Sequence, residues 1–229
     1  MTALNHSDPV VLQISGATST AVGASNKVLR NTYLLLSMTL AFSALVTAVS
    51  VAMKLPAPGL LVTLGGYFGL LFLVTKFRDS AAGLGLVFAL TGFMGYTLGP
   101  IISHYLGLAH GSQIVMTAFL ATGCLFAGLS AYALISRRNF NFMGAFISVG
   151  VLVAFGAGLA AIFFTIPALS LAVSAMFVLL MSGLILFETS NIIHGGETNY
   201  VMATVTLYVA IFNLFTSLLQ LLGFVGGDD

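Results

Sequence analysis

The sequence predicts an all-α, polytopic integral membrane protein: a seven-helix transmembrane bundle with a cytoplasmic N-terminus. Three observations predict this class. Of 229 residues, 59% are hydrophobic and only 6% are charged, and seven stretches are long and apolar enough to cross a bilayer. A soluble domain carries about 25% charged residues, and a nucleic-acid binder needs clustered Lys and Arg for phosphate contacts. We therefore exclude a soluble enzyme and a nucleic-acid-binding protein, and expect membrane lipid around the chain.

Seven windows match the roughly 20 apolar residues that a membrane-spanning helix needs. In chain order they are Thr32–Met53, Gly59–Thr75, Ala81–Ser103, Ser112–Ile135, Phe142–Phe164, Ala168–Phe187 and Tyr200–Leu222. The segments between them are short, which implies antiparallel neighbours in a compact bundle. Runs such as Leu34-Leu35-Leu36 do not alternate between apolar and polar residues, so a transmembrane β-barrel is excluded.

Short tails flank the predicted bundle. Residues 1–26 are rich in Ser, Thr, Ala and Gly, and they lack the basic start, apolar core and cleavage site of a signal peptide. We expect a flexible cytoplasmic tail over residues 1–26, a seven-helix transmembrane domain over 27–223 and a short extracytoplasmic tail over 224–229.

The basic residues predict the orientation in the membrane. If the windows alternate in direction, one side of the membrane carries six of the seven basic residues: Lys27, Arg30, Lys76, Arg78, Arg137 and Arg138. The other side carries only Lys54. Short cytoplasmic loops hold an excess of Lys and Arg, so the side with six basic residues, and with it the N-terminus, is predicted to be cytoplasmic.

Stripes of small residues predict where the helices approach one another closely, because lipid provides no hydrophobic drive for helix association. Three windows carry such stripes: Gly92, Gly95 and Gly99; Thr117, Ala121, Cys124, Gly128 and Ala131; and Gly150, Ala154 and Gly158. Pro100 follows the first stripe and is expected to kink or end that helix.

The seventh window carries a more polar stripe. Thr206, Ala210, Asn213, Ser217 and Gln220 repeat at intervals of four and three, which places them on one helical face. An unpaired amide costs several kcal/mol in hydrocarbon, so this face is expected to point into the bundle. Two interpretations stay open: Asn213 and Gln220 lock helices together, or the stripe lines a polar cavity.

Glu188 is the one charge predicted at membrane depth. If the sixth helix continues to His194 and ends at Gly195-Gly196, Glu188 lies more than a turn inside that end. An ionisable group there is a functional-site hypothesis by default. Three readings are open: a carboxylate that reaches the cytoplasmic interface, a proton- or cation-responsive gate, and a salt bridge with a basic residue such as Lys76 or Arg78.

No catalytic motif is visible, and we predict neither an enzyme nor a bound cofactor or metal. The chain lacks HExxH, GxSxG, GxxxxGK and paired Cys motifs. The loop motif His194, Gly195, Gly196 and Glu197 reads as a compact turn between helices, in which Gly permits the reversal and Thr198 or Asn199 caps the next helix.

Four stretches together resemble the bacterial branch of the Bax inhibitor (TMBIM) family. They are Leu186–Tyr200 (LFETSNIIHGGETNY), the downstream Ala203–Tyr208 and Asn213–Phe215, and Gly95–Ile102 (GYTLGPII) in the third window. The resemblance extends over about residues 27–223 and implies a seven-helix fold in the bacterial inner membrane.

The resemblance also implies two functions. One bacterial branch associates with the membrane-bound AAA protease FtsH and restrains it, and its cytoplasmic N-terminal tail is what the protease engages. Other members are pH-sensitive calcium leak channels with two facing carboxylates and a basic residue at the end of the second span. The first carboxylate corresponds to Glu188 and the second falls on Ala210, while the basic partner is Lys76 or Arg78. Calcium or protons are therefore possible ligands, but a lone Glu offers a divalent ion only one anionic side chain.

Overall fold

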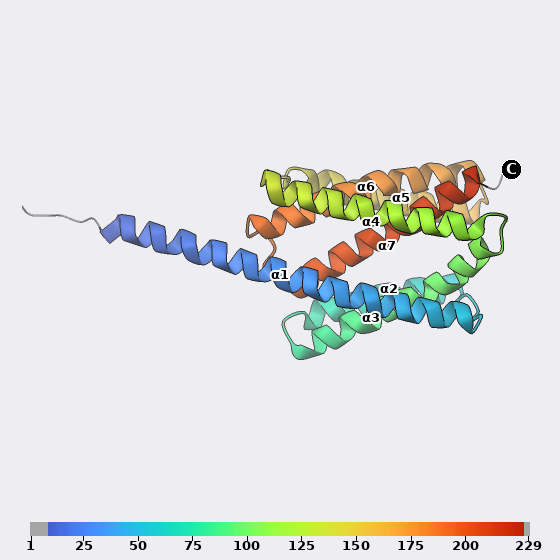
Figure 1. The fold of residues 1–229 in the computed structure, drawn as a ribbon, viewed down its shortest axis with the longest axis horizontal. Helices are drawn as coiled ribbons and strands as arrows, with labels where there is room; N and C mark the ends of the chain where they lie inside the picture. Colours follow the sequence, from blue (N-terminus) through green and yellow to red (C-terminus); the bar gives the residue numbers. More distant parts are fainter. Residues whose placement is uncertain (1–8, 227–229) are drawn as a thin grey trace, which may run out of the picture.

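A computed structural model describes residues 9–226, which fold into seven α-helices (Figure 1). The helices are α1 (Pro9–Ala52), α2 (Leu60–Phe77), α3 (Ala81–Leu106), α4 (Gly111–Ser136), α5 (Met143–Phe163), α6 (Pro167–Ile193) and α7 (Tyr200–Val225). Each is long and apolar enough to cross a membrane, and in α1 this stretch is Gly23–Ala52. The predicted all-α class with seven spans is confirmed.

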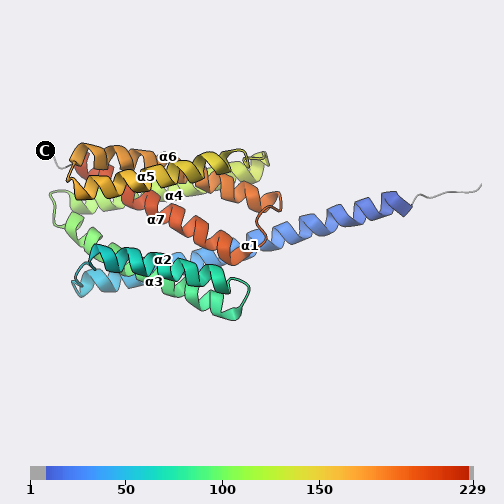
Figure 2. The same ribbon diagram turned by 180° about the vertical axis from the view of Figure 1, so that it is seen from behind.

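The first helix begins earlier than its apolar window suggested. The window started at Thr32, whereas α1 begins at Pro9 and extends beyond the rest of the bundle (Figures 1 and 2). Proline is favoured in the first helical turn, where its missing N–H costs no bond, and the window counted only residues apolar enough for lipid. Of the two predicted tails, residues 1–8 and 227–229 lie outside the described part of the chain.

The helices form two groups with α7 between them. Figures 1 and 2 show α1, α2 and α3 on one side, α4, α5 and α6 on the other, and α7 crossing between the groups. Accordingly, α7 packs against α1, α3, α4 and α6. Its buried side chains, among them Leu207, Tyr208, Ala210 and Leu214, form the centre of the largest hydrophobic cluster.

A polar seam joins α1 to α3. The Gly92, Gly95 and Gly99 stripe faces α1, and a Cβ on Gly95 would lie 2.6 Å from the Ser43 carbonyl oxygen. Thr47 Oγ1 donates to the Gly95 carbonyl at 2.9 Å. The predicted close approach of this stripe is confirmed.

The same seam explains how α3 continues through Pro100 to Leu106. Proline has no N–H for the carbonyl four residues earlier, which is that of Tyr96. Ser50 Oγ of α1 donates to the Tyr96 carbonyl at 3.2 Å. A partner from the neighbouring helix therefore satisfies the acceptor that proline leaves free, as is common in membrane helices.

Of the other two small-residue stripes, one is buried and one is not. Gly150, Ala154 and Gly158 of α5 face α6: a Cβ on Gly150 would contact Leu180, and Ala154 is fully buried. The prediction for the α4 stripe is wrong. Ala121 is half-buried, and the other four residues are exposed: Thr117, Cys124, Gly128 and Ala131. Small residues occupy several faces of α4, and the bundle uses the face of Ile114, Ala118 and Thr122 instead.

Candidate functional site

The C-terminal end of α6 makes polar contacts with α1, with the segment between α4 and α5, and with the turn that follows α6. Ser25 Oγ of α1 donates to the Ile192 and Ile193 carbonyls at 2.6 and 3.0 Å. The Tyr33 hydroxyl, also on α1, lies 3.2 Å from Thr189 Oγ1. A helix end leaves its last carbonyls without partners inside the helix, and here α1 supplies a donor for two of them.

Ser190 ties the same end of α6 to the segment between α4 and α5. Its hydroxyl donates to the Arg138 carbonyl at 3.0 Å and accepts from the Phe140 N–H at 3.0 Å. His194 Nδ1 lies 2.8 Å from the Ser190 carbonyl. Helix α1 and the segment between α4 and α5 are therefore both hydrogen-bonded to the C-terminal end of α6.

Glu188 lies within this polar end and is 4% exposed. Its Oε1 has no hydrogen-bond partner among the described residues. Asn191 lies three residues further along α6, and Glu197 lies in the turn that follows this helix. Of the three readings, a carboxylate that reaches the water interface does not fit this burial.

The two basic candidates contact other groups. Arg78 Nε lies 3.5 Å from Asp79 Oδ2, which is the one salt bridge found within residues 9–226. Lys76 Nζ lies over the Phe77 ring, 5.7 Å from its centroid. Lys76 and Arg78 lie at the same end of the bundle as Glu188, but the structure brings neither into an ion pair with it.

The turn after α6 has a defined hydrogen-bond pattern. Gly195 has φ 75°, a left-handed conformation that favours glycine. The N–H groups of Gly196 and Glu197 donate to the Asn191 carbonyl. Asn199 Oδ1 then accepts from the N–H groups of residues 201 and 202 at the start of α7, while its Nδ2 donates to Asp79 Oδ1 at 2.7 Å. Of the two candidate caps, Asn199 caps α7, and it also joins the α2–α3 loop to this turn.

The polar stripe of α7 divides along its length. Gln220 Oε1 accepts from Ser174 Oγ at 2.6 Å, and Gln220 Nε2 donates to Ser170 Oγ, so this amide links α7 to α6. Asn213 Nδ2 donates to the Val209 carbonyl within its own helix. Ala210 and Ser217 are buried, and Thr206 is half-buried. Ala210 lies in the apolar core, fully shielded.

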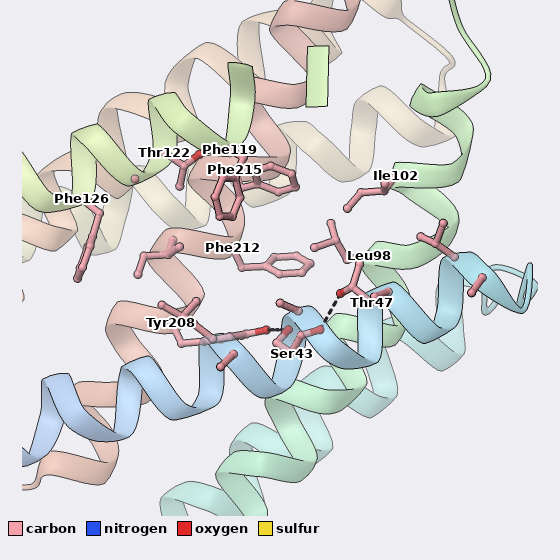
Figure 3. Close-up of a pocket in the computed structure, with 18 residues that line it drawn as sticks. Ser43, Thr47, Leu98, Ile102, Phe119, Thr122, Phe126, Tyr208, Phe212 and Phe215 are labelled. Atoms are coloured by element: carbon pink, nitrogen blue, oxygen red, sulfur yellow. Dashed lines mark hydrogen bonds between the residues drawn. The ribbon is translucent and has the colours of Figure 1, made fainter. Parts of the chain in front are cut away.

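A separate cavity of about 750 Å³ lies between α1, α3, α4 and α7 (Figure 3). Its walls are formed by apolar side chains such as Phe119, Phe126, Phe212 and Phe215, with hydroxyls from Ser43 and neighbouring residues. No residue of the polar α7 stripe lines it.

Tyr208 makes an interhelical contact that sequence reasoning missed. Its hydroxyl lies 2.6 Å from Ser43 Oγ and donates to the Thr91 carbonyl at 3.2 Å, so one side chain joins α7 to α1 and α3. A signal was present: Ser43, Thr47 and Ser50 repeat at intervals of four and three in an otherwise apolar helix, which marks an interhelical face.

Comparison with known proteins agrees with this architecture. The profile of the family described as "Inhibitor of apoptosis-promoting Bax1" matches residues 25–227. The chain belongs to the Bax inhibitor family. It is 57% identical over 202 residues to an uncharacterized protein of Pseudomonas aeruginosa, covering 88% of this chain and 91% of the relative. It is 50% identical over 209 residues to "Modulator of FtsH protease YccA" of Escherichia coli strain K12, covering 91% and 95%. An "uncharacterized membrane protein" of Vibrio cholerae is 41% identical, covering 90% and 92%.

Proposed function

We propose that this chain is an inner-membrane protein that binds a membrane-bound FtsH-type AAA protease and restrains it. The observation that carries the proposal is the 50% identity, over 91% of this chain, to the Escherichia coli protein named as a modulator of that protease. The family profile matches residues 25–227, a range that includes helices α2 to α7 and most of the α1 span. The role is one of protein interaction, without a reaction of its own.

The cytoplasmic projection of α1 supports the proposal. The membrane-crossing stretch begins at Gly23, whereas α1 begins at Pro9. At 1.5 Å per residue, residues 9–22 extend for about 21 Å ahead of the span, and they project away from the bundle (Figure 2). A segment in this position is accessible to a protease whose ATPase domain lies on the cytoplasmic side. In this proposal the tail, residues 1–26, is what the protease engages.

The anchoring of α1 supports the second half of the mechanism. A protease that pulls on the N-terminus must first separate α1 from its neighbours. Helix α1 is hydrogen-bonded to α6 through Ser25, to α7 through Ser43 and to α3 through Thr47. The bundle would therefore resist extraction while the tail occupies the entry path of the protease, and the protease would degrade other substrates more slowly.

A deletion separates tail engagement from binding by the bundle. Removing residues 1–22 preserves Ser25 and its contact with the α6 end. We expect the shortened protein to insert, to copurify with the protease and to slow degradation of a second membrane substrate, yet to escape degradation itself. The matched control is the full chain with Ser25→Ala, which keeps the tail. The proposal is wrong if the full chain neither copurifies with the protease nor slows the second substrate.

A second candidate function, a pH-sensitive cation or calcium leak near Glu188, is favoured by one observation. Glu188 is buried, and its Oε1 has no hydrogen-bond partner in the described part of the chain. Against it, Ala210 holds the position of the family's second carboxylate and is enclosed by apolar side chains.

Liposome flux tests this second function directly. Glu188→Gln keeps the side-chain volume and removes the charge, so it should abolish any flux that the purified protein supports. Glu197→Gln asks whether the neighbouring carboxylate contributes. Flux equal to that of protein-free liposomes at every pH would refute the channel function and would not affect the protease proposal.

A further inference from the structure

The cavity between α1 and α4 has the lining of a hydrocarbon site. None of its 18 lining residues is charged, and its four hydroxyl side chains all have partners within the protein. Ser43 bonds Tyr208, Thr47 bonds the Gly95 carbonyl, and Thr122 bonds the Ala118 carbonyl. Figure 3 shows the aromatic rings of Phe119, Phe126, Phe212 and Phe215 around the space.

The lining and the volume exclude two occupants. A buried water needs two to four polar partners, and the hydroxyls here are already engaged. A helix is at least 10 Å across and rises 5.4 Å per turn, so one turn fills about 400 Å³. The cavity, at about 750 Å³, holds less than two turns, whereas a partner's span needs about 20 residues. A flexible hydrocarbon chain fits where a helix does not.

The cavity can be reached from the bilayer. Helices α1 and α4 form opposite walls, and they are not among the helix pairs that pack extensively on one another. The α1 residues that line it run from Leu40 to Ala52, the extracytoplasmic end of the helix. The twelve steps from Leu40 to Ala52, at 1.5 Å each, span about 18 Å, close to the roughly 15 Å depth of one leaflet's hydrocarbon.

A positive charge lies where the headgroup of such a lipid would be. Lys54 follows α1 by two residues, is exposed, and is the single Lys or Arg at this end of the described bundle. It has no salt-bridge partner within residues 9–226. A chain in the cavity, with its ester groups at the level of Ala52, would bring an anionic phosphate within reach of this ammonium group.

We propose that the cavity between α1 and α4 binds one acyl chain of an anionic phospholipid from the extracytoplasmic leaflet, with the lipid phosphate at Lys54. The site would be filled in the membrane and would brace α1 against α4 through the lipid. It is independent of protease binding and of Glu188.

Two glycines of α4 provide a matched pair of variants. Gly123 lines the cavity and Gly128 does not, and a Cβ on either meets nothing within 4 Å. Leucine at each position improves helix propensity, so both variants should fold. In Gly123→Leu the side chain takes the place of about four methylenes of the acyl chain, so we expect this variant to lose the bound lipid.

Native mass spectrometry of the purified full chain measures the bound lipid. The protein is stripped of lipid and titrated with phosphatidylglycerol or phosphatidylethanolamine of identical chains. We expect wild type and Gly128→Leu to bind one phosphatidylglycerol tightly, and Gly123→Leu to lose that binding. We expect Lys54→Gln to lose the preference for phosphatidylglycerol and Lys54→Arg to keep it. Equal binding by Gly123→Leu and wild type would overturn the site. The proposal would also be overturned if the occupant that Gly123→Leu displaces were a copurifying polypeptide or a free fatty acid instead of a phospholipid. An unchanged headgroup preference in Lys54→Gln would refute the role of Lys54.

Discussion

The Tyr208 hydroxyl is predicted to hold α7 against α1 and α3. The Tyr208 side chain is only 2% exposed. Tyr208→Phe removes its hydroxyl oxygen and leaves Ser43 Oγ without a partner that lies at 2.6 Å. Hydrogen bonds between membrane helices average about 0.6 kcal/mol and reach about 1.7 kcal/mol. The hydroxyl makes two such contacts, so we expect the free energy of unfolding to fall by about 1 kcal/mol, roughly a fivefold change in the unfolding equilibrium.

Equilibrium unfolding in mixed micelles measures this loss, and a double-mutant cycle with Ser43→Ala isolates the pair. The cycle should give a coupling energy of about 0.6 kcal/mol or more, because the two side chains are in direct contact. Tyr132→Phe is the control, since Tyr132 is 49% exposed. A coupling energy of zero, or an equal effect from the control, would refute the argument that this hydroxyl joins the helices.

Three further substitutions test other contacts by the same measurement. Gly95→Ala should cost about 1–3 kcal/mol because its Cβ would meet the Ser43 carbonyl at 2.6 Å, and Gly85→Ala on the same helix, with open space around it, should cost nothing. Gln220→Leu should lower the free energy of unfolding by about 1 kcal/mol through the loss of its two contacts with α6. The control Gln113→Leu, at an exposed position, should leave it unchanged. Equal losses in the two variants would count against the α6–α7 link. Asn199→Ala should lower the free energy of unfolding by about 1 kcal/mol, because α7 loses its cap. Asn199→Ser should restore the cap but not the contact with Asp79. A Ser variant as unstable as the Ala variant would contradict the capping role.

The fold was predictable from the sequence because lipid imposes a length and composition on every span. The windows for α2 to α7 lie within three residues of the observed helices, except that α6 continues six residues beyond its window, to Ile193. The start of α1 was not predictable in this way, since hydropathy reports which residues tolerate lipid and does not report where a helix begins. Pro9 was the available signal.

The site was less predictable, for two physical reasons. Glu188 was recognised because a carboxyl group among apolar residues is rare, and it is buried. Its surroundings depend on how the loops fold, which spacing along a helix does not determine: Lys76 and Arg78 share its side of the membrane, yet Arg78 pairs with Asp79. The α4 stripe failed because small residues occupy more than one face of that helix, and only tertiary packing selects among faces.

The contacts of α1 are individually weak, and this bears on how the bundle can restrain a protease. Each interhelical hydrogen bond contributes about 0.6 kcal/mol, so no single one prevents extraction. They come from Ser25, Ser43, Thr47 and Ser50, which lie along one helix and bond to α6, α7 and α3. A force applied to the N-terminus meets these bonds together only if α1 moves as a rigid rod, and the span is one continuous helix from Gly23 to Ala52. Unwinding α1 turn by turn would meet them one at a time, so the resistance of the bundle depends on the integrity of the α1 helix as much as on its partners.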